Sequence, residues 1–199
     1  MKVLVGPDTE DLAELYAIPR TPWLRVNMVT TVDGAATGET GTSGSINNAA
    51  DKQVFDHLRA TADVIVVGAG TARAEGYGPA DRPIVVVSRR DDVPPTLRGA
   101  PPGRVLVEPL GDPVAFKRSL VDRGWTRILC EGGPSLLAEL LAAGVVDELC
   151  ATIVPRLVAG EHPRITQGPP VDVPLRLHRL LESDGTLLGR WLTDSPDGQ

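Results

Sequence analysis

The sequence predicts an α/β fold with a mostly parallel central sheet flanked by helices and a C-terminal antiparallel hairpin. Three observations carry this prediction. Apolar runs such as Val64–Val67 and Ile84–Val87 are too short for helices and rich in β-branched residues, which is typical of buried parallel strands. Segments with helical spacing alternate with these runs along most of the chain. Two alternating runs near the C-terminus are joined at Asp184 and Gly185, a strong hairpin signal.

The first quarter of the chain predicts a lead-in, a strand and a loop. Residues 1–20 are expected to form a peripheral lead-in with a short helix at Asp8–Tyr16. Trp23–Gly34 is rich in β-formers and closes on Asp-Gly, a turn signal. The stretch after it is rich in glycine and threonine and has no periodicity, so it is expected to be a loop. A helix should follow, capped by Asn48, because apolar residues then recur at helical spacing.

The remaining elements repeat a strand and helix alternation. A helix is expected after Asp112, which can cap it, with Pro113 in its first position and Gly124 at its end. Strands are expected at VIVV, IVVV, RVLVEP, RILC and CATIV, and a further helix follows the glycine turn after RILC.

Composition excludes several classes of protein. The chain has 199 residues, of which 42% are hydrophobic, so it can bury one sizeable core. With no linker to divide it, we expect a single domain over residues 1–199. The net charge of −6 argues against a nucleic-acid binder, which needs a basic face. No apolar run approaches about 18 residues, so nothing is expected to span a membrane.

Neither a metal site nor a targeting segment is expected. Cys130 and Cys150 lie in apolar runs and should be buried thiols, and the three histidines lack zinc-site spacing. The N-terminus has no long apolar core of a signal peptide, so a cytoplasmic location is expected.

Three strand ends carry residues suited to holding phosphates. Ligands of open parallel sheets bind beyond the carboxyl ends of the strands, where glycines let a ligand approach the backbone. A helix beginning at Pro134 would offer free N–H groups to a pyrophosphate. Candidate cofactor-binding residues at these three ends are Gly68, Gly70 and Thr71; Ser88 and Arg89; and Glu131, Gly132, Gly133, Pro134 and Ser135.

The expected cofactor is NADPH rather than NADH, because Ser88 and Arg89 could hold a ribose 2′-phosphate. The pattern is not the usual dinucleotide fingerprint, since Arg73 stands where the third glycine should be. It is not a phosphate-binding P-loop either, because Gly-Lys-Ser and Gly-Lys-Thr are absent. The alternative at this point is that the glycine turns are structural only.

The chain resembles a known family in several motifs. VNMVTTVDGA, FDHLRATADVIVVGAGTARAEGYGP, IVVVSR and ILCEGGPSLLAELLAAGVVDEL are similar to the reductase domain of bacterial riboflavin biosynthesis, whose fold is similar to that of dihydrofolate reductase. The resemblance implies NADPH as cofactor, a homodimer, and reduction of a phosphoribosylamino pyrimidine to its ribitylamino form. Hydride would pass to the anomeric carbon of the ring-opened imine. The terminal hairpin is apolar enough to pack on a second subunit or on its own sheet.

The resemblance also implies roles for residues outside the glycine turns. Asp33 matches the Asp-Gly that lies near substrate and nicotinamide in the family. The loop with Ser45 and Asn47 would contact the substrate, as would Asn27 and Thr31 of the first strand.

One departure opens an alternative. The family commonly carries an arginine for the sugar phosphate near the start of the helix before HLRA, where this chain offers only Lys52. The same stretch, ADKQVF, resembles the helix of dihydrofolate reductases in which a buried carboxylate precedes a phenylalanine by four residues. Asp51 would then bind the amino edge of a pterin and favour its protonated form, and Phe55 would pack on the ring. A non-catalytic NADPH-binding module is the remaining alternative.

Overall fold

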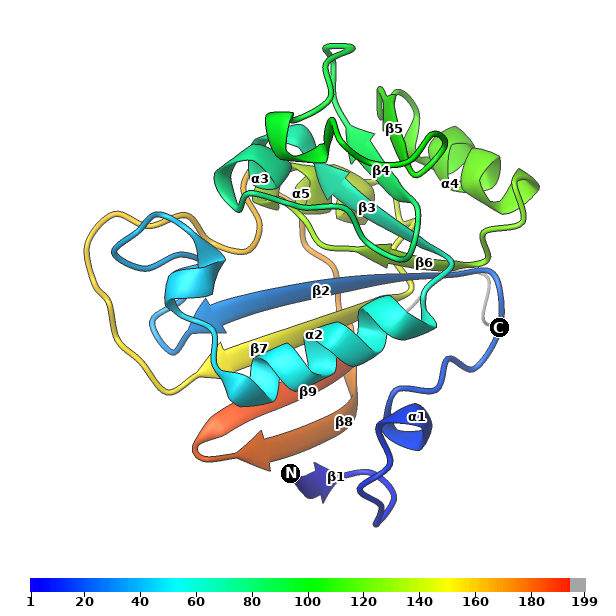
Figure 1. Cartoon of the computed structure of the whole chain (residues 1–199). Coiled ribbons are helices and arrows are strands. Elements are labelled where there is room, and N and C mark those ends of the chain that lie inside the picture. Colours follow the sequence, from blue (N-terminus) through cyan, green and yellow to red (C-terminus); the bar gives the residue numbers. More distant parts are fainter. Residues whose placement is uncertain (194–199) are drawn as a thin grey trace.

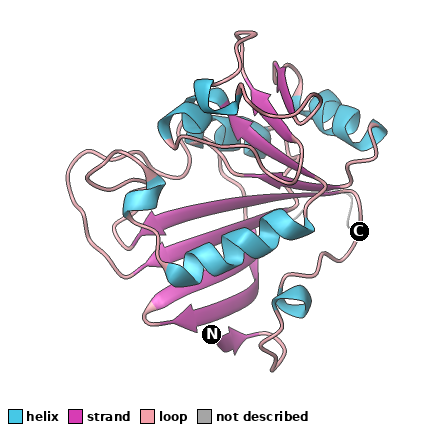
Figure 2. Ribbon diagram, viewed as in Figure 1, coloured by secondary structure: helices cyan, strands magenta, loops and turns pink. Residues whose placement is uncertain are grey.

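The computed structural model describes residues 1–193 and confirms the expected α/β class with a mostly parallel sheet and a C-terminal antiparallel hairpin (Figures 1 and 2). The strands are β1 (Lys2–Val5), β2 (Trp23–Thr31), β3 (Val64–Gly68), β4 (Ile84–Val87), β5 (Val105–Glu108), β6 (Arg127–Cys130), β7 (Glu148–Val154), β8 (Leu175–Ser183) and β9 (Thr186–Thr193). The helices are α1 (Leu12–Leu15), α2 (Ala49–Thr61), α3 (Ala69–Ala74), α4 (Pro113–Asp122) and α5 (Pro134–Ala142), with short 3-10 turns at Ser43–Ser45 and Pro95–Leu97. In this part of the chain no helix has both the length and the apolarity to cross a membrane.

The strands form one sheet in the order β1-β8-β9-β7-β2-β6-β3-β4-β5. The six strands from β7 to β5 are parallel, and β9, β8 and β1 add antiparallel pairs at one side. Asp184 and Gly185 both have positive φ, 50° and 79°, as a tight hairpin turn between β8 and β9 requires. The predicted caps are also confirmed, since the Asn48 side chain accepts hydrogen bonds at the start of α2 and Asp112 does so at the start of α4.

Helices cover both faces of the sheet because strand side chains alternate in direction. On one face Leu24, Val26 and their neighbours pack against α4 and α5. On the other face α1 and α2 pack over Leu129 and Cys150, and α3 packs over Ile65 and Val67. Figure 1 shows α2 lying across this second face of the sheet.

The N-terminal lead-in is less peripheral than expected. Its first residues form β1, which pairs with β8 at the edge of the sheet, and the expected helix is confined to Leu12–Leu15. Leu15 and Tyr16 are buried in the core with α2. The lead-in is therefore part of the domain, since it supplies backbone partners to an edge strand and apolar side chains to one face.

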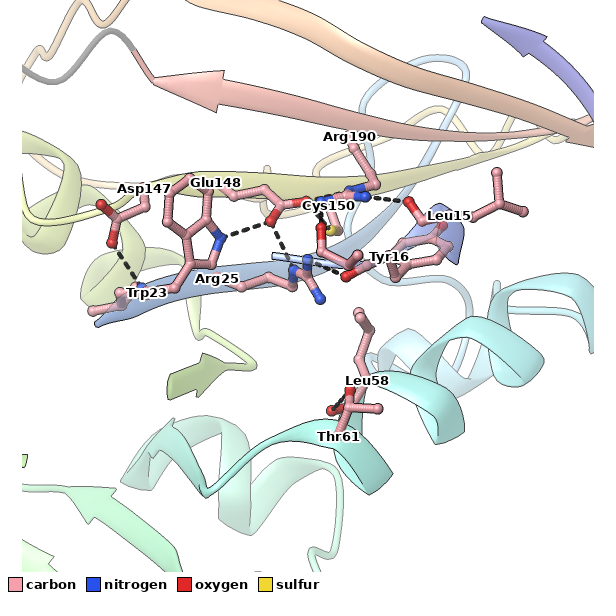
Figure 3. A network of polar contacts seen from close by, with 12 residues as sticks. Leu15, Tyr16, Trp23, Arg25, Leu58, Thr61, Asp147, Glu148, Cys150 and Arg190 are labelled. Atoms are coloured by element: carbon pink, nitrogen blue, oxygen red, sulfur yellow. Dashed lines mark hydrogen bonds and ion pairs between the residues drawn. The ribbon is translucent and has the colours of Figure 1, made fainter. Parts of the chain in front are cut away.

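A buried ion network ties this lead-in to the sheet (Figure 3). The Glu148 carboxylate at the start of β7 is fully buried and accepts hydrogen bonds from Arg25 of β2 at 2.8 Å and from Arg190 of β9 at 2.5 Å. Trp23 Nε1 donates a further hydrogen bond to it at 2.8 Å. The two guanidinium groups also donate to backbone carbonyls at the end of α1, including Leu15 and Tyr16. One carboxylate thus fixes three strands and the lead-in.

Removing this carboxylate should destabilise the fold strongly. In the Glu148→Ala variant both arginines would lose their charge partner while buried, and breaking a buried ion pair in this way costs about 3–5 kcal/mol. The free energy of unfolding, measured by urea titration, reports the loss. The control is Arg127→Ala, which breaks the partly exposed ion pair with Asp63. Exposed ion pairs contribute only about 0–1 kcal/mol to the free energy of unfolding. Equal losses in the two variants would contradict the role of Glu148.

Candidate active site

The carboxyl ends of β6, β3 and β4 lie next to one another, as the sequence predicted for its three glycine- and serine-bearing turns. The Gly68 N–H at the end of β3 donates to the Gly132 carbonyl after β6 at 2.7 Å. The peptide bond between Gly132 and Gly133 is cis, and α5 begins directly after it at Pro134. The three turns therefore form one continuous surface at this edge of the sheet.

Two glycines at this surface leave no space for a side chain. Gly132 has φ of +84°, and a Cβ there would lie 2.9 Å from Met28 Sδ. A Cβ on Gly133 would collide with Thr71 Oγ1. A side chain at Gly133 would displace the Thr71 hydroxyl of α3, and at Gly132 the positive φ itself favours glycine while the Met28 thioether would have to move.

Beyond these turns lies a cavity of about 1,030 Å³, here called the basic cavity. It holds three arginines, Arg73, Arg89 and Arg90, against one lining carboxylate, Glu139. The first turn of α5 adds backbone N–H groups that lack helical partners. The expected cofactor-binding residues that line it are Gly68, Gly70, Thr71, Ser88, Arg89, Gly133, Pro134 and Ser135. Its charge and its backbone donors suit a ligand with several phosphates.

A second cavity of about 560 Å³, here called the inner cavity, adjoins the first. The expected substrate residues Asn27, Asn47, Asp51 and Phe55 line it. The two cavities share a wall made of Gly70, Thr71, Gly133, Pro134 and Gln167. The two cavities are therefore direct neighbours at the carboxyl ends of the strands.

Asp51 and Glu131 are buried carboxyl groups in the lining of the inner cavity, and within residues 1–193 Asp51 has no arginine partner. It lies in the first turn of α2, is 5% exposed, and its backbone N–H is capped by the Asn48 side chain. Burial raises the pKa of the Asp51 carboxyl above its ordinary value, and a hydrogen bond from the Thr152 hydroxyl of β7 partly offsets this. Asp51 is therefore suited to hold a proton or to bind a cationic or donor-bearing ring edge.

Glu131, which was expected to bind the cofactor, is hydrogen-bonded to Arg59 and Tyr77. Its buried carboxylate accepts two hydrogen bonds from Arg59, both at 2.7 Å, and one from the Tyr77 hydroxyl at 2.6 Å. The Arg59 guanidinium lies 4.3 Å from the Phe55 ring centroid and 5.1 Å from that of Tyr77. Glu131 therefore faces the inner cavity, where it holds this stack of flat groups together.

Four expected site residues, Asp33, Thr31, Ser45 and Gly132, are not among the residues that line the two cavities. Asp33 is exposed, and its carboxylate accepts from the Thr31 hydroxyl and from the backbone N–H groups of Val158 and Ala159, at 3.1 and 2.8 Å. The Thr31 hydroxyl also accepts from Ala35 N–H, and the Ser45 hydroxyl bonds within its own loop. The Asp33 carboxylate anchors the loop after β7, and a role for Asp33 near substrate and nicotinamide stays a prediction.

Several lining residues were not predicted. Arg59 follows Asp51 and Phe55 at successive intervals of four residues, so helical spacing could have placed it on the same face of α2. Tyr77 and Gln167 carry no local signal, because loops bring them to the cavity from distant parts of the chain. The loop after β7 borders both cavities and is held by the hydrogen bond from Gln167 N–H to the Pro134 carbonyl.

Comparison with known proteins identifies the family. Residues 22–188 match the model of the RibD C-terminal domain. The chain belongs to this family. The riboflavin biosynthesis protein RibD of Mycobacterium tuberculosis is 30% identical over 171 residues, covering 80% of this chain and 49% of that protein, so the chain spans about half the length of this relative. A 2,5-diamino-6-ribosylamino-4(3H)-pyrimidinone 5′-phosphate reductase of Methanothermobacter thermautotrophicus is 29% identical, covering 72% of this chain and 82% of that protein.

Solved structures agree with membership of the RibD C-terminal domain family. A pyrimidine reductase-like protein of Corynebacterium diphtheriae is 25% identical with a TM-score of 0.72, covering 86% of this chain and 92% of that one. Dihydrofolate reductase of Enterococcus faecalis superposes with a TM-score of 0.58 at 14% identity, covering 87% of this chain and 97% of that one, which shows a shared fold.

Opposite pKa shifts at Asp51 and Asp33 predict opposite effects of removing their charges. The raised pKa of Asp51 means that the folded chain binds its proton more tightly than the unfolded chain, so stability falls as the pH rises through the ordinary and then the raised pKa. Asp51→Asn should therefore be more stable than wild type near pH 7, and this advantage should shrink below about pH 4.

Asp33→Asn is the matched control. Hydrogen bonds from the Thr31 hydroxyl and from backbone N–H groups lower the pKa of Asp33 to about 2. This carboxylate therefore stabilises the fold above its unfolded pKa and loses that effect as the pH falls toward about 2. Urea titrations near pH 7 and below about pH 4 measure the free energy of unfolding of both variants and of the wild type. An Asp51→Asn variant less stable than wild type at neutral pH would contradict the burial penalty at Asp51.

Proposed function

We propose that this protein is an NADPH-dependent reductase. Its substrate would be a ribosylamino-pyrimidine phosphate, a compound of the kind that occurs as an intermediate in riboflavin biosynthesis. The observation that carries the proposal is the wall shared by the basic and inner cavities, because hydride transfer requires cofactor and substrate to meet. Membership of the RibD C-terminal domain family and the names of the pyrimidinone phosphate reductase relatives support the choice of substrate.

The residues present fit a phosphorylated dinucleotide. The basic cavity offers glycine backbone near Gly68 and Gly133 for a pyrophosphate, the start of α5 for its charge, and arginines for a 2′-phosphate. Arg73 and Arg90 would act beside Ser88 and Arg89 in selecting NADPH over NADH. The bound cofactor would supply hydride, and the chain supplies position and shielding from water.

Within the inner cavity the polar residues have distinct roles. Asn27 and Asn47 offer amide donors and acceptors to the edge of a pyrimidine ring. Asp51 is the proton source in this proposal, because Glu131 is bound by Arg59 and Glu75 accepts from the Ser43 N–H at 2.7 Å. Reduction of the imine then balances: hydride adds to carbon, and the proton of the Asp51 carboxyl adds to nitrogen.

Among residues 1–193, Lys52 and Arg59 are the cationic side chains that line the inner cavity, and Lys52 is the one available to the substrate phosphate. Arg59 is held by Glu131 and stacked between two rings, whereas Lys52 lies at the mouth. Lys52 Nζ contacts both Asp56 oxygens, at 2.8 and 2.7 Å, in an exposed pair one helical turn apart. Such a pair is weak, so Lys52 can turn to a phosphate.

A second candidate is a pterin reductase of the dihydrofolate reductase type. The buried Asp51 with the Thr152 hydroxyl beside it, and Phe55 one helical turn away on the cavity wall, favour this candidate. In that reaction Asp51 would bind the amino edge of the pterin.

The proposal is tested by NADPH oxidation with the ribosylamino-pyrimidine 5′-phosphate, the same compound without phosphate, and dihydrofolate. We expect turnover with the first compound and a higher KM without the phosphate. Turnover of dihydrofolate alone would select the second candidate. NADPH binding by calorimetry without turnover of any compound would indicate a non-catalytic binding module.

Lys52 and Asp56 provide a matched pair of variants for the phosphate. Lys52→Met should raise KM for the phosphorylated compound by about tenfold, the value of roughly one charge-assisted hydrogen bond. Asp56→Asn frees Lys52 and should lower the same KM. Neither substitution should change KM for the compound without phosphate, and an equal effect on both compounds would contradict a phosphate contact.

We also propose a homodimer that uses the edge formed by β1 and β8. Leu4, Val5, Leu175 and Leu177 are 39–45% exposed there. β1 pairs only with Leu180–Glu182, which leaves the first half of β8 as an open edge. Light scattering should give twice the chain mass, and the double variant Leu175→Lys, Leu177→Lys should give the single mass. A single mass for wild type would overturn the dimer.

A further inference from the structure

Helix α2 separates the inner cavity from another cavity on its other side. Asp51, Phe55 and Arg59 line the inner cavity, whereas His57, Leu58 and Thr61 line a cavity of about 220 Å³ between α2, β2 and the end of α1. Trp23 and Arg25 form its wall on the β2 side. This α1–α2 cavity lies toward the start of β2, away from the carboxyl ends where the two larger cavities meet.

The buried network beside this cavity carries an excess of positive charge. Arg25, Arg190 and Glu148 are at most 6% exposed and together hold two cations and one anion. Arg190 directs all three of its guanidinium nitrogens to Glu148, Leu15 and Ala17. Backbone carbonyls offset part of the excess, but a buried cation without a full charge partner remains costly.

Arg25 keeps one guanidinium nitrogen available. Its Nε donates to Glu148 and its Nη2 to the Tyr16 carbonyl at 2.7 Å, while Nη1 has no protein partner within residues 1–193. In the same residues Arg179 Nε is the one unpaired side-chain atom that is sealed from solvent, so Arg25 Nη1 is accessible. Figure 3 shows the Arg25 guanidinium on the side of β2 that faces Leu58 and Thr61, which is the side of the cavity.

We infer that the α1–α2 cavity binds a small single-ring carboxylate, with Arg25 Nη1 as its charged contact. The walls supplied by Leu58, Ala62 and Leu129 are apolar and suit a ring. The cavity is smaller than the roughly 300–1,000 Å³ of sites for drug-sized ligands, which limits the ligand to about one ring. The second guanidinium in the lining, that of Arg127, is paired with Asp63 through its Nε and Nη2. The free nitrogen of Arg25 can donate to one oxygen of a carboxylate.

The neighbouring aromatic and imidazole groups agree with this assignment. Burial and the positive charge of Arg25 lower the pKa of His57, so the Arg25 charge acts on a side chain that lines the cavity. Both effects favour the neutral imidazole of His57, which is a further hydrogen-bonding group in the lining. The Tyr16 ring lies beneath both guanidinium groups, 5.8 Å from Arg25 and 5.3 Å from Arg190.

The test uses benzoate and benzamide, which share a shape and differ in charge. Trp23 lines the cavity, so its indole N–H signal in a two-dimensional NMR spectrum, assigned by Trp23→Phe, reports occupation. Millimolar benzoate should shift this signal, and benzamide should bind at least about tenfold more weakly, the difference expected for one charge-assisted contact. No shift with benzoate, or equal binding of the two compounds, would overturn the inference.

Two variants locate the binding. Thr61→Trp places an indole in the cavity from α2, leaves Arg25 itself unchanged and should abolish the benzoate shift. Arg25→Met leaves Glu148 paired with Arg190 and should weaken benzoate but not benzamide. If Arg25→Met fails to fold, Thr61→Trp decides, because unchanged benzoate binding there places the ligand elsewhere. None of these readouts depends on turnover, so they remain valid if the proposed reaction is wrong.

Discussion

The contact between the ends of β3 and β6 is the constraint on which the rest of the site depends. The hydrogen bond from Gly68 N–H to the Gly132 carbonyl brings the two turns together, and the absence of side chains at Gly132 and Gly133 lets Met28 and Thr71 approach them. Because α3 and α5 begin at these turns, the same contact sets where both helices start. The wall between the two larger cavities is made largely of this junction.

The two larger cavities differ in charge, and the difference separates their ligands. Arginines dominate the basic cavity, whereas the inner cavity holds three carboxyl groups, of which Glu131 is neutralised by Arg59. A polyanionic cofactor is therefore favoured on one side and a small ring with hydrogen-bond donors on the other. Burial raises the pKa of Asp51, and the hydrogen bond from Thr152 offsets only part of this effect.

Helix α2 connects the functional parts of the molecule. Its period places Asp51, Phe55 and Arg59 on one side and Leu58 and Thr61 on another, so a single rigid element contributes to the inner and the α1–α2 cavities. The buried carboxylate of Glu148 fixes the strands opposite this helix. The N-terminal segment thereby becomes part of the framework that holds α2 in place.

The sequence alone determined the local features. Short β-branched runs, the caps at Asn48 and Asp112, and the turn at Asp184 and Gly185 are set by neighbouring residues, and the structure contains them. The convergence of the three turns was also predictable, because the carboxyl ends of parallel strands share one edge. Only the tertiary structure decided what each polar side chain contacts. Glu131 meets Arg59 and Asp33 meets the loop after β7 through contacts far apart in the chain, and no local pattern specifies such pairings.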